Sequence, residues 1–285
     1  MRAASLLLCS VALALVCAAS SPALASLTED FNDPTHAAQW TTWHEACFLQ
    51  SGEGPPHESV LAITQGRLWG ANGQAWYSSR MPSRQFVADF QFEIHAGPGS
   101  YWPAGITFGW VSDINEAWGA GYGAYWEHVN QSWTFGYPGN FVTFQSFEQE
   151  RSGHGQVWAC DSHPTYGDIV SQIYQMPWVG SNWYDARVRL DPNGTDARVR
   201  VWLDDDGNGQ VNEALAPILD YSISDYKLDT AYFGFTGAAG WVDAPQRVDN
   251  VRLTSGSPVP EPASCALLAV AIGGIGAMLK RRKRA

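Results

Sequence analysis

Apolar and polar residues alternate along several stretches in the middle of the chain. In residues 85–95 every second position from Phe86 to Ile94 is apolar, and all the positions between them except Val87 are polar. Residues 183–190 repeat the pattern. A period of two is that of a half-buried strand with one face against a core. The pattern therefore predicts antiparallel strands at both places.

Turn residues separate these stretches. Asn193 and Gly194 lie between 183–190 and a third alternating stretch, 198–203. Asn-Gly between two such stretches is a strong hairpin signal. Short segments bounded by Gly, Pro, Asn and Asp recur along the chain, and no stretch of ten or more residues between its two ends has a convincing helical period. This predicts an all-β sandwich or barrel.

Other segments add strands to this sandwich. Residues 104–111 and 231–240 are apolar almost throughout, which is typical of central strands, and 26–33 reads as an edge strand. Residues 247–253 close the series. There the inward phase changes between Val248 and Val251, so we expect a β-bulge near 249–250.

The two ends of the chain differ from the middle. Residues 1–25 combine a basic start, an apolar run and a small-residue cleavage pattern after Ala25, which predicts a secretory signal peptide. Residues 263–279 are apolar and just long enough for a membrane helix. The basic residues of 280–285 follow and should stay on the cytoplasmic side. We therefore expect 26–257 to be an exported body.

The C-terminal segment 258–285 has three parts in a fixed order. Pro260, Glu261 and Pro262, within 259–262, precede the apolar helix and the basic tail. This order resembles the PEP-CTERM sorting signal, which exosortases of Gram-negative bacteria process. The resemblance implies export by the Sec route, anchoring in the inner membrane, and then sorting to the cell surface or extracellular matrix. An ordinary membrane anchor is the alternative.

The predicted body is strongly acidic. It keeps 27 of the 28 acidic residues and 11 of the 17 basic ones, so its net charge is about −16. Such a field argues against nucleic acid or anionic lipid as a partner. It suits cations and neutral sugars.

Two of the five cysteines, Cys47 and Cys160, lie in the body. In an exported protein such a pair predicts a disulfide. A thiol–metal site in which Cys160 joins His154 and His163 is the alternative.

Three segments of the body, 104–108, 232–240 and 248–253, together resemble the concanavalin A-like family of legume-type lectins, laminin-G-like modules and related glucanases. The second is similar to the GFSAATG-type strand of lectins. The resemblance implies a jelly-roll sandwich of two antiparallel sheets. It implies sugar binding only as a tendency of the family, because a fold does not determine function.

An acidic loop follows 198–203. Asp204, Asp206 and Asn208 stand at the first, third and fifth positions of an EF-hand-like loop, and Gln210 at the seventh. Oxygens spaced in this way can converge on Ca²⁺. The acid expected at the twelfth position is replaced by Leu215. A polar hairpin loop without metal is the alternative.

Candidate residues for sugar chemistry are of two kinds. Glu148 and Glu150 have the spacing of a glycosidase acid pair, but the third acid of that motif is missing. Trp118, Tyr122 and Trp133 lie in a Gly-rich stretch that could present aromatic rings to a sugar, although aromatic residues also fill sandwich cores.

These observations favour an exported, noncatalytic protein that binds or organises extracellular polysaccharide in a biofilm matrix. The partners expected are an exosortase, the polysaccharide and, before sorting, the inner membrane. A glycoside hydrolase of the same fold and a matrix protein without a ligand are the alternatives.

Overall fold

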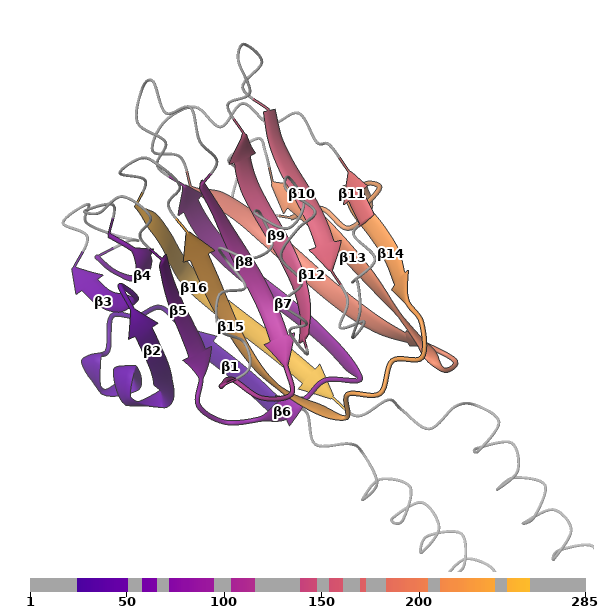
Figure 1. Cartoon of the computed structure of the whole chain (residues 1–285), viewed down its shortest axis with the longest axis horizontal. Helices are drawn as coiled ribbons and strands as arrows, with labels where there is room; N and C mark the ends of the chain where they lie inside the picture. The colour runs from indigo at the N-terminus through magenta and orange to yellow at the C-terminus, as the bar shows by residue number, and fades with distance from the viewer. Residues whose placement is uncertain are drawn as a thin grey trace, which may run out of the picture. The chain divides into compact units, whose positions relative to one another are not determined.

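Two antiparallel β-sheets lie face to face in the computed structural model of the chain (Figure 1). The residues that the structure describes are 25–50, 58–65, 72–94, 104–115, 139–147, 154–160, 170–172, 183–204, 211–238 and 245–256. Within them no helix is long and apolar enough to cross a membrane. The predicted signal peptide, apart from Ala25, and residues 258–285 lie outside this set.

Sheet A has the strand order β14-β13-β12-β7-β16-β4-β3, and β1 pairs with β16 outside that path. Its strands in chain order are β1 (Ala25–Glu29), β3 (Cys47–Gln50), β4 (Ser59–Thr64), β7 (Gln85–Ile94), β12 (Tyr184–Asn193), β13 (Asp196–Asp204), β14 (Leu219–Ile223) and β16 (Gln246–Gly256).

Sheet B has the order β11-β10-β9-β8-β15-β5-β2, and β6 pairs with β15. Its strands are β2 (Trp40–His44), β5 (Asn72–Tyr77), β6 (Met81–Pro82), β8 (Ala104–Val111), β9 (Gly139–Phe147), β10 (His154–Cys160), β11 (Val170–Gln172) and β15 (Thr230–Ala238). A short 3-10 helix, η1 (Pro34–Gln39), precedes β2. The predicted all-β fold is confirmed, and β8 is central as expected.

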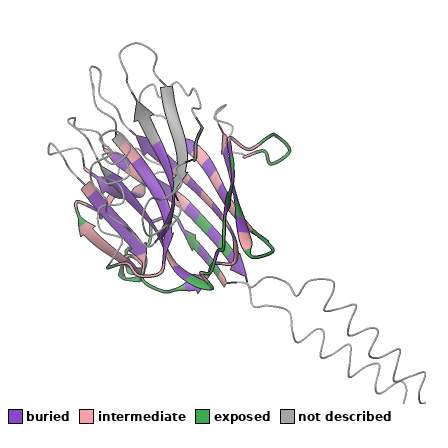
Figure 2. Ribbon diagram, turned by 45° about the vertical axis from the view of Figure 1, so that its right-hand side comes forward, coloured by how far each residue is buried: buried purple, intermediate pink, exposed green. Residues whose placement is uncertain are grey.

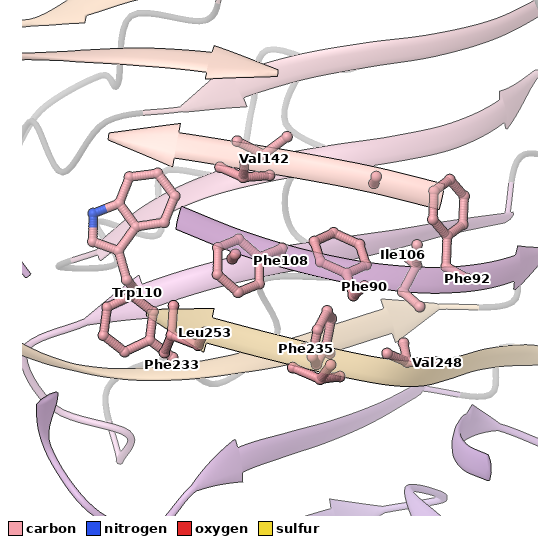
Figure 3. Packing of buried hydrophobic residues seen from close by; sticks show 14 of the residues in the cluster. Phe90, Phe92, Ile106, Phe108, Trp110, Val142, Phe233, Phe235, Val248 and Leu253 are labelled. Atoms are coloured by element: carbon pink, nitrogen blue, oxygen red, sulfur yellow. The ribbon is translucent and has the colours of Figure 1, made fainter. Parts of the chain in front are cut away.

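The core lies between the sheets, where the inward residues of both are buried (Figure 2). Phe90 of β7 illustrates the contact: its ring centroid is 5.4 Å from that of Phe108 on β8 and 5.1 Å from that of Phe235 on β15 (Figure 3). Burial of each such side chain stabilises the fold by about 1.5–3 kcal/mol. The alternation predicted for β7 and β12 is confirmed, since every second residue of each is buried.

The hairpin between β12 and β13 is also confirmed, and its turn is one residue later than the Asn-Gly dipeptide suggests. Asn193 pairs with Asp196, so Gly194 and Thr195 are the two turn residues. Gly194 has φ of 65°, whereas Thr195 has no positive φ. Glycine at the first central position is the signature of a type II′ turn, which matches the twist of the strands.

The predicted change of phase in β16 is confirmed at Asn250. Val248 and Val251 are three residues apart, yet both are buried in the core. Asn250 between them has φ of 50°, which turns the strand by an extra residue. Here β16 changes its neighbour, since Val248 pairs with β4 and Val251 with Glu29 of β1. A second irregularity, at Gln246 and Arg247, lies outside the predicted place.

The structure does not bring Cys47 and Cys160 together. Cys160 is in β10, and four successive strand pairings separate it from Trp76 in β5, a distance of about 19 Å. Cys47 is the first residue of β3. Its neighbour Ala46 lies beside Gly73 of β5, on the side of the sandwich away from β10 (Figure 1). A disulfide needs Cα atoms within about 7 Å. The placement of these strands therefore argues against the predicted disulfide, and Cys47 Sγ accepts a hydrogen bond from Gln65.

Candidate functional site

The outer face of sheet B carries a row of two aromatic and two glycine residues. Trp76, Gly234, Gly109 and Phe141 are direct neighbours across β5, β15, β8 and β9. The residues that follow or precede them along each strand point into the core, so this row faces outward. A Cβ atom added to Gly109 would lie 3.0 Å from Trp76 Cη2 and 2.9 Å from Phe141 Cδ1. The glycines thus form a floor on which the two rings meet.

A rim of partly exposed residues surrounds these rings. Trp43, Ile114 and Tyr232 are partly buried and pack against Trp76, Val111 and Phe141. We call these six residues the aromatic face. Trp76 and Phe141 have exposed fractions of 0% and 6%, so they support the face from below. The rings that solvent can reach are those of Trp43 and Tyr232.

A row of polar side chains lies beside the aromatic row. Gln74, Thr236, Thr107 and Thr143 are direct neighbours across the same four strands. Trp76 Nε1 donates to Gln74 Oε1 at 3.2 Å, and the hydroxyls of Thr107 and Thr143 share a hydrogen bond of 2.9 Å. The Thr236 hydroxyl is different: the side chain is 1% exposed, and its oxygen makes no hydrogen bond.

The two rows together have the chemistry of a site for a polyhydroxylated ligand. Aromatic rings provide apolar surface for stacking, and hydroxyl and amide groups provide directional hydrogen bonds. Buried polar atoms are rarely left without a partner in native proteins. The Thr236 hydroxyl is an exception to this rule, and it is closed to solvent.

The outer face of sheet A is of the opposite kind. Arg187 donates to Asp89 at 3.1 Å and to Glu213 at 2.7 Å, and Arg189 shares Glu213 and binds Asp191. Because Asp89 accepts from Arg187, the pKa of the Arg187 guanidinium lies above its usual value. Two more pairs complete the array: Arg200 with Asp191 and Arg198 with Asp220. Charge on this face is neutralised within the sheet.

Asp204 is the one residue of the predicted calcium set among those described. It ends β13, is buried, and lies directly opposite Asp185 of β12. Asp206, Asn208 and Gln210 lie outside the described residues. Within these, no group of three or more His, Cys, Asp and Glu side chains could hold a metal.

Two residues that follow the acidic loop, Leu215 and Glu213, stand at or near its twelfth position, where a ligand is missing. Leu215, which stands at the position of the expected acid, is 65% exposed, so it is not directed into a metal cage. Glu213, the nearest acid in sequence, has both oxygens bound by Arg187 and Arg189. Among the described carboxylates, Asp185 is the one that faces Asp204. The spacing of residues within the loop could not indicate it, because Asp185 lies on β12 and comes opposite Asp204 through the register of the hairpin.

The other predicted site residues lie outside the described part of the chain. They are Trp118, Tyr122, Trp133, Glu148, Glu150, Pro260, Glu261 and Pro262. The aromatic face consists of residues that the sequence reading did not single out. One signal was available: in β15 the outward position of Gly234 follows the outward aromatic residue Tyr232.

Comparison with known proteins adds two findings. Residues 258–284 match the PEP-CTERM protein-sorting motif, which confirms the resemblance seen at the C-terminus. The fold is that of the legume lectins and other concanavalin A-like proteins. No curated protein matches the chain by sequence.

Three solved structures illustrate the fold. Basic winged bean lectin with Tn-antigen is 15% identical with a TM-score of 0.56, over 83% of this chain and 100% of that one. Lectin UEA-II complexed with galactose is 13% identical with a TM-score of 0.57, over 82% and 98%. The exoplasmic/lumenal domain of VIP36, in a Ca²⁺/Man3GlcNAc-bound form, is 12% identical with a TM-score of 0.55, over 84% and 91%.

Proposed function

We propose that this chain is an exported protein that an exosortase sorts through residues 258–284, and that its sandwich binds extracellular polysaccharide without catalysis. The observation that carries the proposal is the aromatic face on a lectin-like sheet, in a chain with a sorting motif. The setting is the cell surface or biofilm matrix of a Gram-negative bacterium. The Sec route and a temporary inner-membrane anchor at 263–279 are part of the proposal.

Sugar is the ligand class that the aromatic face suits best. The C–H faces of pyranose rings stack on indole and phenol rings, and Trp43 and Tyr232 are open to such contact. Gln74 and three threonines lie on the same face but are buried, so Trp43 and Tyr232 are the groups that a sugar would contact. The solved relatives with galactose and Man3GlcNAc bind sugars on the same fold.

The binding test uses the full chain in detergent and a panel of bacterial polysaccharides. We expect Trp43→Ala and Tyr232→Ala each to weaken binding about tenfold or more, because each removes a stacking surface. The matched control is Trp202→Phe, since Trp202 lies on sheet A and donates to Leu215. Absence of binding to every polysaccharide would contradict the proposal and favour a matrix protein without a ligand.

Hydrolysis is tested on the same panel. The four strands β5, β8, β9 and β15 contain no Asp or Glu, so an acid pair acting at this face would have to come from outside them. Glu148 and Glu150 follow β9 directly and are the candidates. Release of reducing ends by the wild type, abolished by Glu150→Gln, would replace the binding proposal with the glycosidase alternative.

The sorting proposal is tested in cells that make an exosortase. Replacing Pro260, Glu261 and Pro262 by alanine should leave an unprocessed, membrane-bound chain, because the recognised motif is lost. The control replaces three residues of the basic tail by other basic residues. Normal processing of the alanine variant would overturn the sorting step.

We also propose a calcium ion at the end of β13, with Asp185 completing the loop. Asp185 lies directly opposite Asp204 on the adjacent strand, where paired side chains are close enough to share a ligand. Asp204, Asp206, Asn208 and the carbonyl of Gln210 would supply the other oxygens, which are the ligands that Ca²⁺ prefers. The ion would stiffen the loop after β13; the VIP36 structure contains Ca²⁺ on a similar fold.

A further inference from the structure

Most basic side chains of the described residues are paired with carboxylates. Seven make ion pairs, namely Arg84, Arg187, Arg189, Arg198, Arg200, Lys227 and Arg247. Arg80 and Arg252 make none, although the body has a large excess of acids. Arg252 lies on the exposed side of β16. Arg80 lies at the edge of the aromatic face, so the two are not equivalent.

Arg80 is exposed but held in place. Its guanidinium carbon lies 5.6 Å from the centre of the Tyr232 ring, and its Nη2 donates to the backbone oxygen of Thr230 at 2.7 Å. Asp229, which directly precedes Thr230 in the sequence, accepts a hydrogen bond from Arg84 Nε at 2.7 Å instead of pairing with Arg80. Stacking on a ring and one bond to a carbonyl orient the guanidinium without neutralising it. Its remaining N–H groups are free to bind an anion.

A guanidinium beside an aromatic ring can recognise a particular class of sugar. Its planar N–H fork matches a carboxylate, whereas neutral sugar hydroxyls gain less from the charge. A sugar packed against the part of the Tyr232 ring that Arg80 does not cover would place substituents of its own ring near Arg80. Uronic acids are the common polysaccharide components that carry such a carboxylate directly on the sugar ring.

The charge of the body limits how many such sugars the ligand can carry. At physiological ionic strength charges are screened beyond about 8 Å, so one carboxylate at Arg80 feels mainly that guanidinium. A polymer with a carboxylate on every sugar would extend over the acidic surface and be repelled. We infer that the aromatic face takes a polysaccharide in which isolated uronic acid residues are separated by neutral sugars, and that Arg80 selects the uronic acid. This inference rests on the proposed polysaccharide binding.

The experiment compares each polysaccharide with its carboxyl-reduced form, which has the same backbone without the charge. The panel holds polymers with one uronic acid per repeat, such as deacylated gellan and xanthan, together with dextran and polygalacturonate. The full chain should bind at least one native polymer about tenfold tighter than its reduced form. Arg80→Gln should bind both forms with the affinity of the reduced form, and Arg80→Lys should lie between. The control Arg252→Gln should behave as the wild type.

The outcomes separate the two proposals. Equal binding of native and reduced forms by the wild type, tighter binding of polygalacturonate than of the sparse polymers, or the same loss in Arg252→Gln overturns the inference and leaves polysaccharide binding in place. Binding to no polymer overturns both. Arg80 is exposed, so its replacement should leave the core unchanged. A near-ultraviolet circular dichroism spectrum identical to that of the wild type shows that a variant is correctly folded.

Discussion

The indole ring of Trp76 covers Gly234 on the neighbouring strand. A Cβ atom at Gly234 would come within 2.6 Å of Trp76 Cε3 and 2.3 Å of the backbone oxygen of Ala75. The aromatic face therefore depends on a position without a side chain, because any side chain at Gly234 would displace both the ring and the strand that carries it.

Gly234→Ala is expected to lower the free energy of unfolding by about 2–3 kcal/mol or more, since backbone atoms have to move. Urea denaturation measures the change. The control is Gly194→Ala, where a Cβ meets no atom within 4 Å and only the φ of 65° is unfavourable, so a loss of about 1 kcal/mol is expected. Equal losses in the two variants would show that the contact with Trp76 has no special cost.

Thr236→Val is expected to raise stability. It replaces a buried hydroxyl that has no hydrogen bond by a methyl group of similar size, which removes a cost of about 1–3 kcal/mol. Thr107→Val is the matched control: it breaks the bond to Thr143 and should lower stability by about 1 kcal/mol. Thermal unfolding is measured on both. A Thr236→Val variant that loses stability would show that the hydroxyl does have a hydrogen-bond partner in the folded protein.

Removal of calcium is expected to lower the melting temperature of the full chain. A ligand at one hundred times its Kd stabilises the folded state by about 2.7 kcal/mol, and chelation reverses this. Asp185→Asn and Asp206→Asn should reduce the calorimetric shift between calcium and chelator. Asp220→Asn, which removes the partner of Arg198, should leave that shift unchanged. An identical melting temperature with calcium and with chelator would remove the ion from the proposal.

The buried hydroxyl of Tyr226 is expected to make the folded protein less stable at alkaline pH. Burial raises the pKa of its hydroxyl to about 12, and the hydroxyl donates a hydrogen bond to Ser83 O. The unfolded chain loses this proton near pH 10, so the folded state holds it more tightly. The contribution is complete below pH 10 and is lost as pH rises to 12, by roughly 2–3 kcal/mol. Urea melts should show this slope in the wild type and a flatter one in Tyr226→Phe.

A reducing agent is expected to leave the unfolding transition unchanged. A disulfide between Cys47 and Cys160 would close a loop worth up to about 4–5 kcal/mol. The strands that bear these residues lie far apart, so we expect no such contribution to be lost. Peptide mapping without reduction gives the direct answer: a linked peptide containing both cysteines would refute the arrangement of β3 and β10.

Much of the fold could be predicted from local pattern. The alternation in β7 and β12, the hairpin after Asn193 and the change of phase at Asn250 all follow from how side chains alternate along a single strand. The sorting motif could also be recognised from the sequence, because it is one continuous segment. These features need no knowledge of which strands are neighbours.

The functional surface was decided by the tertiary structure. Trp76, Gly234, Gly109 and Phe141 come from four separate strands and meet only because the sheet order and register place them in one row. The same is true of Asp185 opposite Asp204, and of the distance that keeps Cys47 from Cys160. Sequence by itself determined which residues face inward and that the chain carries a sorting motif, since both are properties of short segments. Which outward residues face each other depends on long-range pairing, and only the folded sheets establish it.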